Sequence, residues 1–334
     1  MKPLIGITMG DPAGVGPELI VKLLKNKSFD FSKFIIFGSS KVLDYEFRKY
    51  NVRIPIKNFS TIGSVDTSKE FILNFEPKKF DFNFEIGKIN PNCGKLAYEA
   101  ILNAIEFANR GLIKAIVTGP INKESLKLAS VELIGHTEIL SKKSKSNDVF
   151  MLMVNDELKV ILCTIHVPLL KAVLSLDEKL ILKTIIAANK ACYNFGIKSP
   201  RIGVAGLNPH AGENGTMGDE EQIFIKPAIQ EAINSGLNVS GPFSPDIIFS
   251  LAREKKFDIV VSLYHDQGLI PFKYFGVGNG VNITIGLPFV RTSPDHGTAF
   301  DIAGENKANS SSLINAIKHA QMIYNQRIKY DKKL

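Results

Sequence analysis

The chain alternates short aliphatic and β-branched runs with longer segments of helical periodicity, which restricts it to few folds. This alternation predicts a mainly parallel sheet with helices packed on it. We expect short strands and loops in 52–92, which is rich in Phe, Asn and Lys. Strands are predicted at 4–9, 34–37 and 115–118, and helices at 17–25, 96–108, 175–195 (opened by a Ser175–Glu178 capping box), 220–234, 245–255 and 310–328.

Three further strand-like runs are each followed by a histidine. In open α/β sheets ligands bind beyond the carboxyl ends of the strands. Three imidazoles gathered there could hold one divalent metal and leave positions open for substrate. Each histidine could instead simply end its own strand, but the polar loops around all three favour a shared site. The pairs are 159–165 with His166, 201–207 with His210, and 258–264 with His265.

The length, charge and cysteine content restrict the kind of protein that the chain can be. A length of 334 residues suggests roughly two domains, and 45% hydrophobic with 22% charged residues is ordinary for a soluble globular protein. The net charge of +8 comes from scattered lysines without a dense basic stripe, which favours an acidic small substrate over nucleic acid. We expect no signal peptide and no membrane span. Three cysteines without CxxC spacing fit a reducing cytoplasm.

A glycine-rich loop at 10–18 joins the first predicted strand to the first helix. Gly14 and Gly16 supply G-x-G, but Leu19 occupies the third glycine position of a dinucleotide fingerprint, and no Walker-type loop exists. The loop offers a tight turn, Pro17 at a first helical position, and a helix N-terminus that could face an anion.

Five longer motifs make the chain recognisable. Taken in order, they resemble the 4-hydroxythreonine-4-phosphate dehydrogenase family of pyridoxal phosphate biosynthesis, from residue 4 to about 305. The loop at 296–304, followed by Ala308 and Asn309, also resembles the adenosine-binding loop of the isocitrate/isopropylmalate dehydrogenase superfamily. The five motifs are ITMGDPAGVGPE at 7–18, GHTE at 135–138, GLNPHAGE at 206–213, YHDQGLIPFK at 264–273 and GLPFVRTSPDHGTAFD at 286–301.

The resemblance implies an isocitrate/isopropylmalate dehydrogenase-like fold. Such a fold has two α/β domains with mainly parallel sheets and a cleft between them. By analogy, residues 1–128 with 286–334 form the cofactor-side domain, and 129–285 form the domain for metal, substrate and dimerisation. The resemblance also implies a homodimer with active sites at the subunit interface. From the cysteines, the charge pattern and the hydropathy we expect a cytoplasmic protein with neither a nucleic-acid nor a membrane partner.

The implied reaction is the NAD- or NADP-dependent, metal-dependent oxidation of 4-phosphooxy-L-threonine at C3. The product, 2-amino-3-oxo-4-phosphooxybutanoate, decarboxylates to 3-amino-2-oxopropyl phosphate on the route to pyridoxine 5'-phosphate. A relative acting on threonate or erythronate 4-phosphate would carry the same metal and phosphate motifs. A metal-dependent decarboxylase or lyase without redox chemistry is a further alternative, which the adenosine-like loop argues against.

Metal and substrate roles follow from the resemblance. His166, His210 and His265 are the implied metal ligands, one of them donated by a partner subunit. Imidazole donors suit Zn or Co better than Mg, although substrate and water oxygens in open positions could admit Mg. Lys273 and Arg291 lie among apolar, Gly and Pro residues, where an unpaired charge would be costly. The implied substrate contacts are His136, Thr137, Lys273, Asn282 and Arg291.

Catalytic and cofactor residues are less determined. Asp266 and Asp246 are both candidates for orienting the ligands or for taking the hydroxyl proton. Asp301 aligns with a position that meets the adenine ribose, where an acid would accept from the 2'-hydroxyl and favour NAD over NADP; it could also cap a local turn. The implied cofactor residues are Asp11, His296, Gly297 and Asp301.

Overall fold

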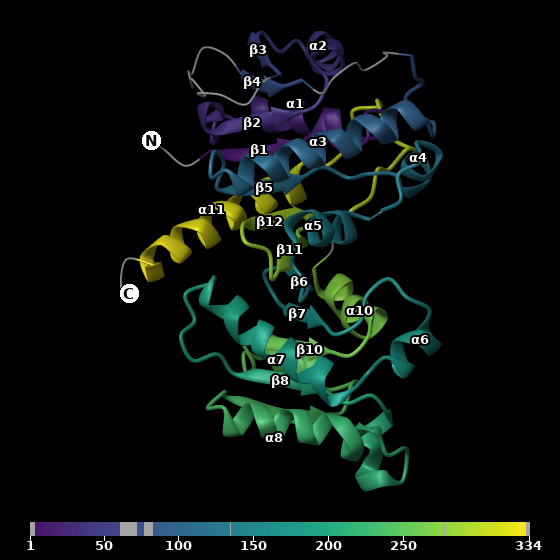
Figure 1. Ribbon diagram of the computed structural model, residues 1–334, viewed down its shortest axis with the longest axis vertical. Helices are drawn as coiled ribbons and strands as arrows, with labels where there is room; N and C mark the ends of the chain where they lie inside the picture. The colour runs from purple at the N-terminus through teal and green to yellow at the C-terminus, as the bar shows by residue number, and fades with distance from the viewer. Residues whose placement is uncertain (1–3, 61–71, 77–82, 134, 277, 332–334) are drawn as a thin grey trace. The chain divides into compact units, whose positions relative to one another are not determined.

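The computed structural model describes residues 4–60, 72–76, 83–133, 135–276 and 278–331 (Figure 1). Contacts divide the chain into two compact units, a first unit of 1–147 with 287–321 and a second unit of 148–286 with 322–334. Residues 129–147, which the analogy assigns to the other domain, belong to the first unit. Part of the predicted 52–92 stretch, at 61–71 and 77–82, lies outside the described residues.

The first unit is built on a parallel sheet. Its described strands follow the order β3-β4-β2-β1-β5-β12, and every neighbouring pair is parallel. The predicted strands at 34–37 and 115–118 are confirmed to the residue. The strands are β1 (Ile5–Thr8), β2 (Phe34–Phe37), β3 (Ile56–Phe59), β4 (Ile72–Phe75), β5 (Ala115–Thr118) and β12 (Val290–Pro294).

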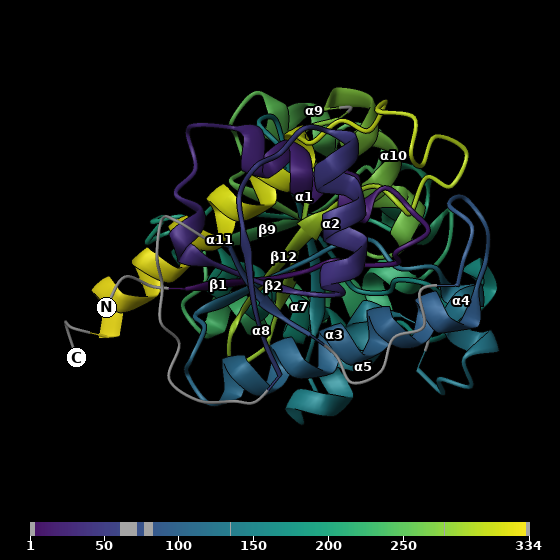
Figure 2. The same cartoon turned by 90° about the horizontal axis from the view of Figure 1, so that it is seen from above.

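Helices cover both faces of this sheet (Figure 2). Helices α1 and α2 pack together on one face, while α3 lies on the other face against β1 and β5. Helix α5 contacts α3, which explains why residues 129–147 join the first unit. The helices are α1 (Gly16–Lys25), α2 (Ser40–Lys49), α3 (Pro91–Asn109), α4 (Lys123–Leu128), α5 (His136–Ser144) and α11 (Ser311–Asp331), of which residues 311–321 belong to this unit.

Aromatic rings fill the core at one end of the first sheet. Phe107 of α3 meets Phe37 and Phe75 edge-on, with ring centroids 5.1 Å apart in both pairs. Phe59 of β3 contacts Phe75 at 5.2 Å. Edge-to-face pairs of this kind stabilise a core beyond the area that they bury. The phenylalanines of β2, β3 and β4 therefore anchor α3 to this end of the sheet.

The second unit contains a mixed sheet. Its described strands follow the order β11-β6-β7-β10-β8-β9. Strand β6 is antiparallel to both β11 and β7, and the other neighbours are parallel. The sheets of the chain are thus mostly parallel, as predicted. The strands are β6 (Phe150–Val154), β7 (Lys159–Leu162), β8 (Ile202–Ala205), β9 (Val239–Phe243), β10 (Ile259–Ser262) and β11 (Val281–Ile285).

A close helix–strand contact fixes α10 on this sheet. A Cβ placed on Gly268 would lie 2.7 Å from Leu162 Cδ2 and 2.8 Å from Val160 Cγ1, so only glycine allows this approach. Leu269 and Phe272 then join Val160 and Leu162 in one buried cluster. The helices are α6 (Leu169–Leu174), α7 (Glu178–Tyr193), α8 (Lys226–Asn234), α9 (Ile248–Arg253) and α10 (His265–Phe275).

Two predicted helix starts are corrected. Asp177, not Ser175, caps α7, because its Oδ1 accepts from the Leu180 amide at 2.6 Å. Ser175 instead ends α6, where its hydroxyl donates to the Ala172 carbonyl. The predicted helix at 220–234 opens with a π-helical turn, Glu221–Ile225, before α8. No helix among the described residues is both long and apolar enough to cross a membrane.

Candidate functional site

Two of the three predicted metal ligands lie close together in the second unit. His166 follows β7 and His265 begins α10, and their ring centroids are 5.6 Å apart. Both rings line a pocket of about 250 Å³ together with Asp266 and Tyr264. Parallel pairing of β7 and β10 brings these two strand ends together.

The third predicted ligand lies elsewhere in the chain. His210 is exposed on the loop after β8. No three His, Cys, Asp or Glu side chains of the described residues are arranged to hold a metal. His210 stands five residues beyond the end of β8, on a turn of its own, whereas His265 follows β10 by three. A metal site that takes all three imidazoles, one of them from a second copy of the chain, stays a prediction.

Each candidate catalytic aspartate lies beside a different histidine. Asp266 Oδ1 is 2.7 Å from His265 Nδ1. The Ser244 hydroxyl donates to Asp246 at 2.5 Å, and this hydrogen bond lowers the pKa of Asp246, with a smaller contribution from the charge of His210. A carboxylate next to an imidazole fixes its tautomer and orientation. Asp266 is therefore placed to orient His265, whereas Asp246 bonds to Ser244 and is near enough to His210 for their charges to interact.

The buried Arg291 and the half-buried His136 form a polar cluster in the first unit. Arg291 is only 2% exposed, and its Nη2 donates to Thr118 Oγ1 at 2.7 Å. Burial lowers the pKa of Arg291 to about 9. Burial, and then the charge of Arg291, hold the pKa of His136 well below its usual value. His136 Nε2 is buried without a hydrogen-bond partner. A cation beside a free imidazole nitrogen fits an anionic ligand that also carries a donor.

The other predicted substrate contacts differ in their surroundings. Thr137 lies in the first turn of α5, next to His136, and is half-buried. Asn282 lies on β11, and its Oδ1 is buried without a partner. Lys273, near the end of α10, is exposed. Among the apolar neighbours of Lys273 in sequence, Phe272 is buried, whereas Ile270 and Tyr274 are exposed. The argument from a costly buried charge therefore does not apply to Lys273, and it applies to the buried Arg291.

The predicted cofactor segments of the first unit pack against each other. The Val15 amide donates to the Thr298 carbonyl at 3.0 Å. A Cβ on Gly14 would lie 2.8 Å from that carbonyl oxygen, so the close approach requires glycine. Gly297 faces open space, since a Cβ there would meet nothing within 4 Å.

Asp11, His296 and Asp301 occupy distinct environments near these segments. Asp11 is fully buried, and its Oδ1 accepts from the Ala13 amide at 2.9 Å. Burial raises the pKa of Asp11 to about 6. His296 Nδ1 lies 3.0 Å from the Gly297 carbonyl, and its Nε2 is buried without a partner. Asp301 is exposed, and its contact with a ribose stays a prediction.

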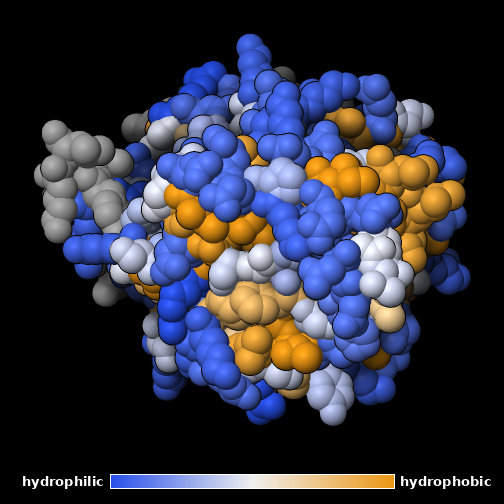
Figure 3. All heavy atoms as spheres, turned by 90° about the horizontal axis from the view of Figure 1, so that it is seen from below, coloured by the Kyte–Doolittle hydropathy of each residue, from blue (hydrophilic) through white to orange (hydrophobic). Residues whose placement is uncertain are grey.

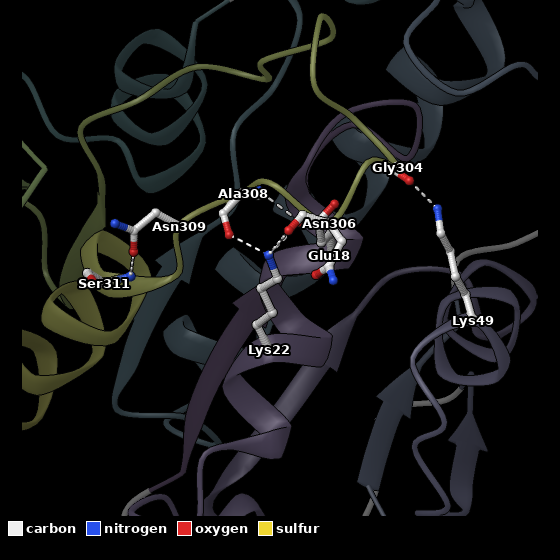
Figure 4. A network of polar contacts seen from close by, with 8 residues as sticks. All are labelled: Glu18, Lys22, Lys49, Gly304, Asn306, Ala308, Asn309 and Ser311. Carbon is white, nitrogen blue, oxygen red and sulfur yellow. Dashed lines mark hydrogen bonds and ion pairs between the residues drawn. The ribbon is translucent and has the colours of Figure 1, made fainter.

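Sequence reasoning missed the residues that hold the 304–308 segment (Figure 4). Lys22 Nζ donates to the carbonyls of Asn306 at 3.0 Å and Ala308 at 2.6 Å, and it pairs with Glu18 at 2.8 Å. Glu18 Oε1 accepts from the Ala308 amide at 2.9 Å. Lys49 Nζ donates to the Gly304 carbonyl. Glu18 belongs to the GPE motif. The sequence signal for this contact is Lys22, which follows Glu18 by one helical turn.

Comparison with known proteins identifies the family. Residues 30–320 match the family model of the pyridoxal phosphate biosynthetic protein PdxA. The chain belongs to this family. It is 43% identical over 95% of its length to a 4-hydroxythreonine-4-phosphate dehydrogenase of Beijerinckia indica, covering 94% of that protein. It is 41% identical over 96% of its length to the D-threonate 4-phosphate dehydrogenase of Salmonella typhimurium, covering 98%.

Solved structures of the PdxA family share the fold. The 4-hydroxythreonine-4-phosphate dehydrogenase of Klebsiella pneumoniae superposes with a TM-score of 0.85 at 38% identity, over 97% of this chain and 100% of that one. The isocitrate/isopropylmalate dehydrogenase-like fold is thereby confirmed. The chain is a dehydrogenase, an oxidoreductase that needs a nicotinamide cofactor.

We expect Asp11→Asn to stabilise the protein at neutral pH. The pKa of Asp11 is raised from its ordinary 3.8 to about 6, so the folded state binds the proton more tightly and loses stability as the pH rises between these values. At one pKa unit per 1.4 kcal/mol, the cost of ionisation reaches about 3 kcal/mol.

Urea unfolding at pH 8 and at pH 4 measures this difference. The variant should gain stability at pH 8 and none at pH 4. Asp44→Asn, on the exposed face of α2, is the control. An equal effect of Asp11→Asn at both pH values would contradict the assignment.

We expect Lys22→Met to weaken cofactor binding. The substitution removes two hydrogen bonds to the 304–308 backbone while keeping the aliphatic stem. Hydrogen bonds from charged donors are worth about 1.5–3 kcal/mol, so the KM for the nicotinamide cofactor should rise about tenfold or more with little change in kcat. Lys41→Met, exposed on α2, is the control. A fall in kcat alone, measured by steady-state kinetics, would refute a role of Lys22 in cofactor binding.

Proposed function

We propose that the chain oxidises 4-phosphooxy-L-threonine at C3 in pyridoxine 5'-phosphate biosynthesis, in the cytoplasm. The hydride leaves C3 for the nicotinamide, and the hydroxyl proton passes to a base. The product, 2-amino-3-oxo-4-phosphooxybutanoate, is a β-keto acid that loses CO₂ to give 3-amino-2-oxopropyl phosphate. The observation that carries the proposal is the Arg291–His136 cluster, which provides a buried cation and an unpartnered imidazole nitrogen for an anionic substrate.

Each polar residue then has a task toward the substrate. Arg291 binds an anionic group of the substrate through its planar guanidinium. His136 stays neutral because its pKa is low, and Nε2 accepts a hydrogen bond. Thr137 and Asn282 add hydroxyl and amide contacts, and Lys273 supplies a second positive charge.

The imidazoles fit a divalent metal, with Zn or Co favoured and Mg as an alternative. His166 and His265 lie together, and neutral nitrogen donors match the preference of such ions. When bound, the ion supplies Lewis-acid chemistry that lowers the pKa of the substrate alcohol. Asp266 and Asp246 orient the histidines, and either carboxylate could take the hydroxyl proton.

We assign the cofactor to the segments around Gly14 and Thr298. His296 and Gly297 border the open space there, and Asp11 lines the opening loop. Asp301 would accept from a free 2'-hydroxyl of the adenine ribose and repel a 2'-phosphate. NAD is therefore the preferred cofactor over NADP.

A second candidate substrate is D-threonate 4-phosphate. The Salmonella typhimurium relative at 41% identity carries that name, against 43% for the Beijerinckia indica relative. The two substrates share the phosphate and the C3 alcohol and differ at C2, which bears an amino group in one and a hydroxyl in the other.

A substrate panel tests the function. We expect kcat/KM for 4-phosphooxy-L-threonine to exceed that for D-threonate 4-phosphate by at least about tenfold, because a site built for one polar group leaves unpaired partners with another. The kcat/KM measured with NAD should exceed that measured with NADP. Chelation should abolish NADH formation, and Zn²⁺ or Co²⁺ should restore it.

Two other results of the substrate panel would change the proposed function. The reverse substrate ratio would assign the chain to the second candidate. CO₂ release without NADH formation from any substrate would instead indicate the lyase alternative.

We propose further that the chain forms a homodimer and that a second copy supplies His210 to the metal. The rings of His166 and His265 lie together, whereas no third ligand of the same chain, among its described residues, completes the group. The flanking helices α6 and α10 expose apolar side chains suited to an interface. These are Leu169 at 61% exposed, Leu170 at 71%, Leu174 at 75%, Ile270 at 68% and Tyr274 at 82%. Apolar patches also interrupt the polar surface on the face seen in Figure 3.

Mixing inactive variants tests this arrangement. His166→Ala and His210→Ala should each be inactive alone. Unfolded together and refolded at equal amounts, they should recover about a quarter of wild-type activity, because half of the dimers are mixed and each has one intact site. His166→Ala mixed with His265→Ala is the control and should recover none, since both changes fall on the same half-site. Equal recovery in both mixtures would contradict the shared site.

A further inference from the structure

The loop that carries His210 has an unusual backbone. Six consecutive residues, His210–Gly215, have positive φ, from 42° at Glu213 to 97° at Gly215. Gly212 and Gly215 adopt this left-handed region readily, but it is uncommon for the other four. Such a turn persists only where its surroundings over-determine it. The cause must therefore lie in what this turn contacts.

A buried carboxylate holds the start of this left-handed turn. Glu221 is 1% exposed. Its Oε1 accepts from the amides of Leu207 at 2.8 Å and Asn208 at 2.7 Å. Its Oε2 accepts from Asn208 Nδ2 at 2.9 Å. One side chain thus binds three N–H donors within the two residues that precede Pro209.

The same carboxylate also packs against the turn itself. A Cβ on Gly212 would lie 2.6 Å from Glu221 Oε2, so glycine is needed for the turn to reach it. Within the turn, the Ala211 amide donates to the Asn208 carbonyl at 3.1 Å, and the Met217 amide donates to the Gly212 carbonyl at 3.1 Å. Glu221 therefore contacts the loop both before the turn, at Leu207 and Asn208, and within it, at Gly212.

The backbone that presents Glu221 is itself irregular. Glu221 is the first residue of the π-helical turn that precedes α8. Single π-turns of this kind occur often at functional sites, where they redirect one side chain. A second tie fixes the base of the loop, because Gln267 Nε2 donates to the Gly206 carbonyl at 2.7 Å. Gln267 lies on α10, two residues after His265.

We propose that Glu221 is a positioning residue that presets His210 for metal binding. The inference rests on the ligand role of His210 under the proposed function. A ligand supplied to another copy of the chain cannot be ordered by the histidines of its own chain, so its geometry has to be fixed beforehand by its own loop. Glu221 meets neither metal nor substrate and acts through the turn. Preorganisation of this kind strengthens binding by reducing the ordering cost.

Cobalt binding by the whole protein tests the proposal without reference to turnover. Wild type, Glu221→Ala, Glu221→Gln and His210→Ala are titrated with Co²⁺, and the visible absorption of bound Co²⁺ gives the Kd. Loss of a residue that orients a ligand costs about 10–100-fold in metal affinity, which is the rise expected for Glu221→Ala. Glu221→Gln keeps the shape and one acceptor oxygen, so its Kd should lie between those of Ala and wild type.

Further readouts separate positioning from general destabilisation. Saturating Co²⁺ should restore turnover to Glu221→Ala but not to His210→Ala. Hydrogen exchange should accelerate at the 207–214 amides of Glu221→Ala and stay unchanged in β7 and β10. Glu231→Ala, exposed on α8, is the matched control and should keep the wild-type Kd. If Glu221→Ala does not fold, the Co²⁺ titration of Glu221→Gln tests the positioning role instead.

The outcomes distinguish this inference from the proposed function. A wild-type Kd in both Glu221 variants, with a weakened His210→Ala, overturns the positioning role alone. A wild-type Kd in His210→Ala removes His210 from the metal and overturns the proposed ligand set together with this inference.

Discussion

The parallel register of β7, β10 and β8 is the constraint on which the second unit depends. Val260 of β10 pairs with Val160 on one side and with Gly203 on the other. Because all three strands run the same way, their carboxyl ends meet at one edge of the sheet. His166 and His265 are neighbours for this reason, although almost a hundred residues separate them in the chain. Helix α10 can begin directly at His265 because Gly268 lets it approach β7.

Much of this arrangement follows from local patterns in the sequence. The buried runs at 34–37 and 115–118 are continuous and apolar, so their bounds can be predicted to the residue. Helix α10 cannot be predicted in the same way, because Gly268 and Pro271 lie in its interior and both disfavour helix in isolation. Packing against β7 outweighs that preference. Ser175 and Asp177 are both possible N-caps for α7, and the sequence alone does not decide between them. In the structure Asp177 caps the helix.

The site divides similarly into predictable and unpredictable parts. The residue types of the candidate site can be predicted, because histidines that follow strands and an arginine among apolar residues stand out in the sequence. The placement of His210 cannot be predicted, since the left-handed turn depends on Glu221, eleven residues later in the chain, and on a π-turn that no periodicity indicates. The tie between Lys22 and the 306–308 backbone joins segments nearly three hundred residues apart and involves carbonyl oxygens, which carry no sequence signal.

Buried charge explains why the Arg291 cluster favours an anion. At a pKa of about 9, Arg291 remains charged at neutral pH although burial opposes that charge. Burial, and then the charge of Arg291, keep His136 neutral. An anion bound at Arg291 would offset that charge, but burial, the larger cause, continues to oppose protonation of the ring. His136 therefore stays neutral and accepts at Nε2, so the cluster matches an anionic group that lies beside a hydrogen-bond donor.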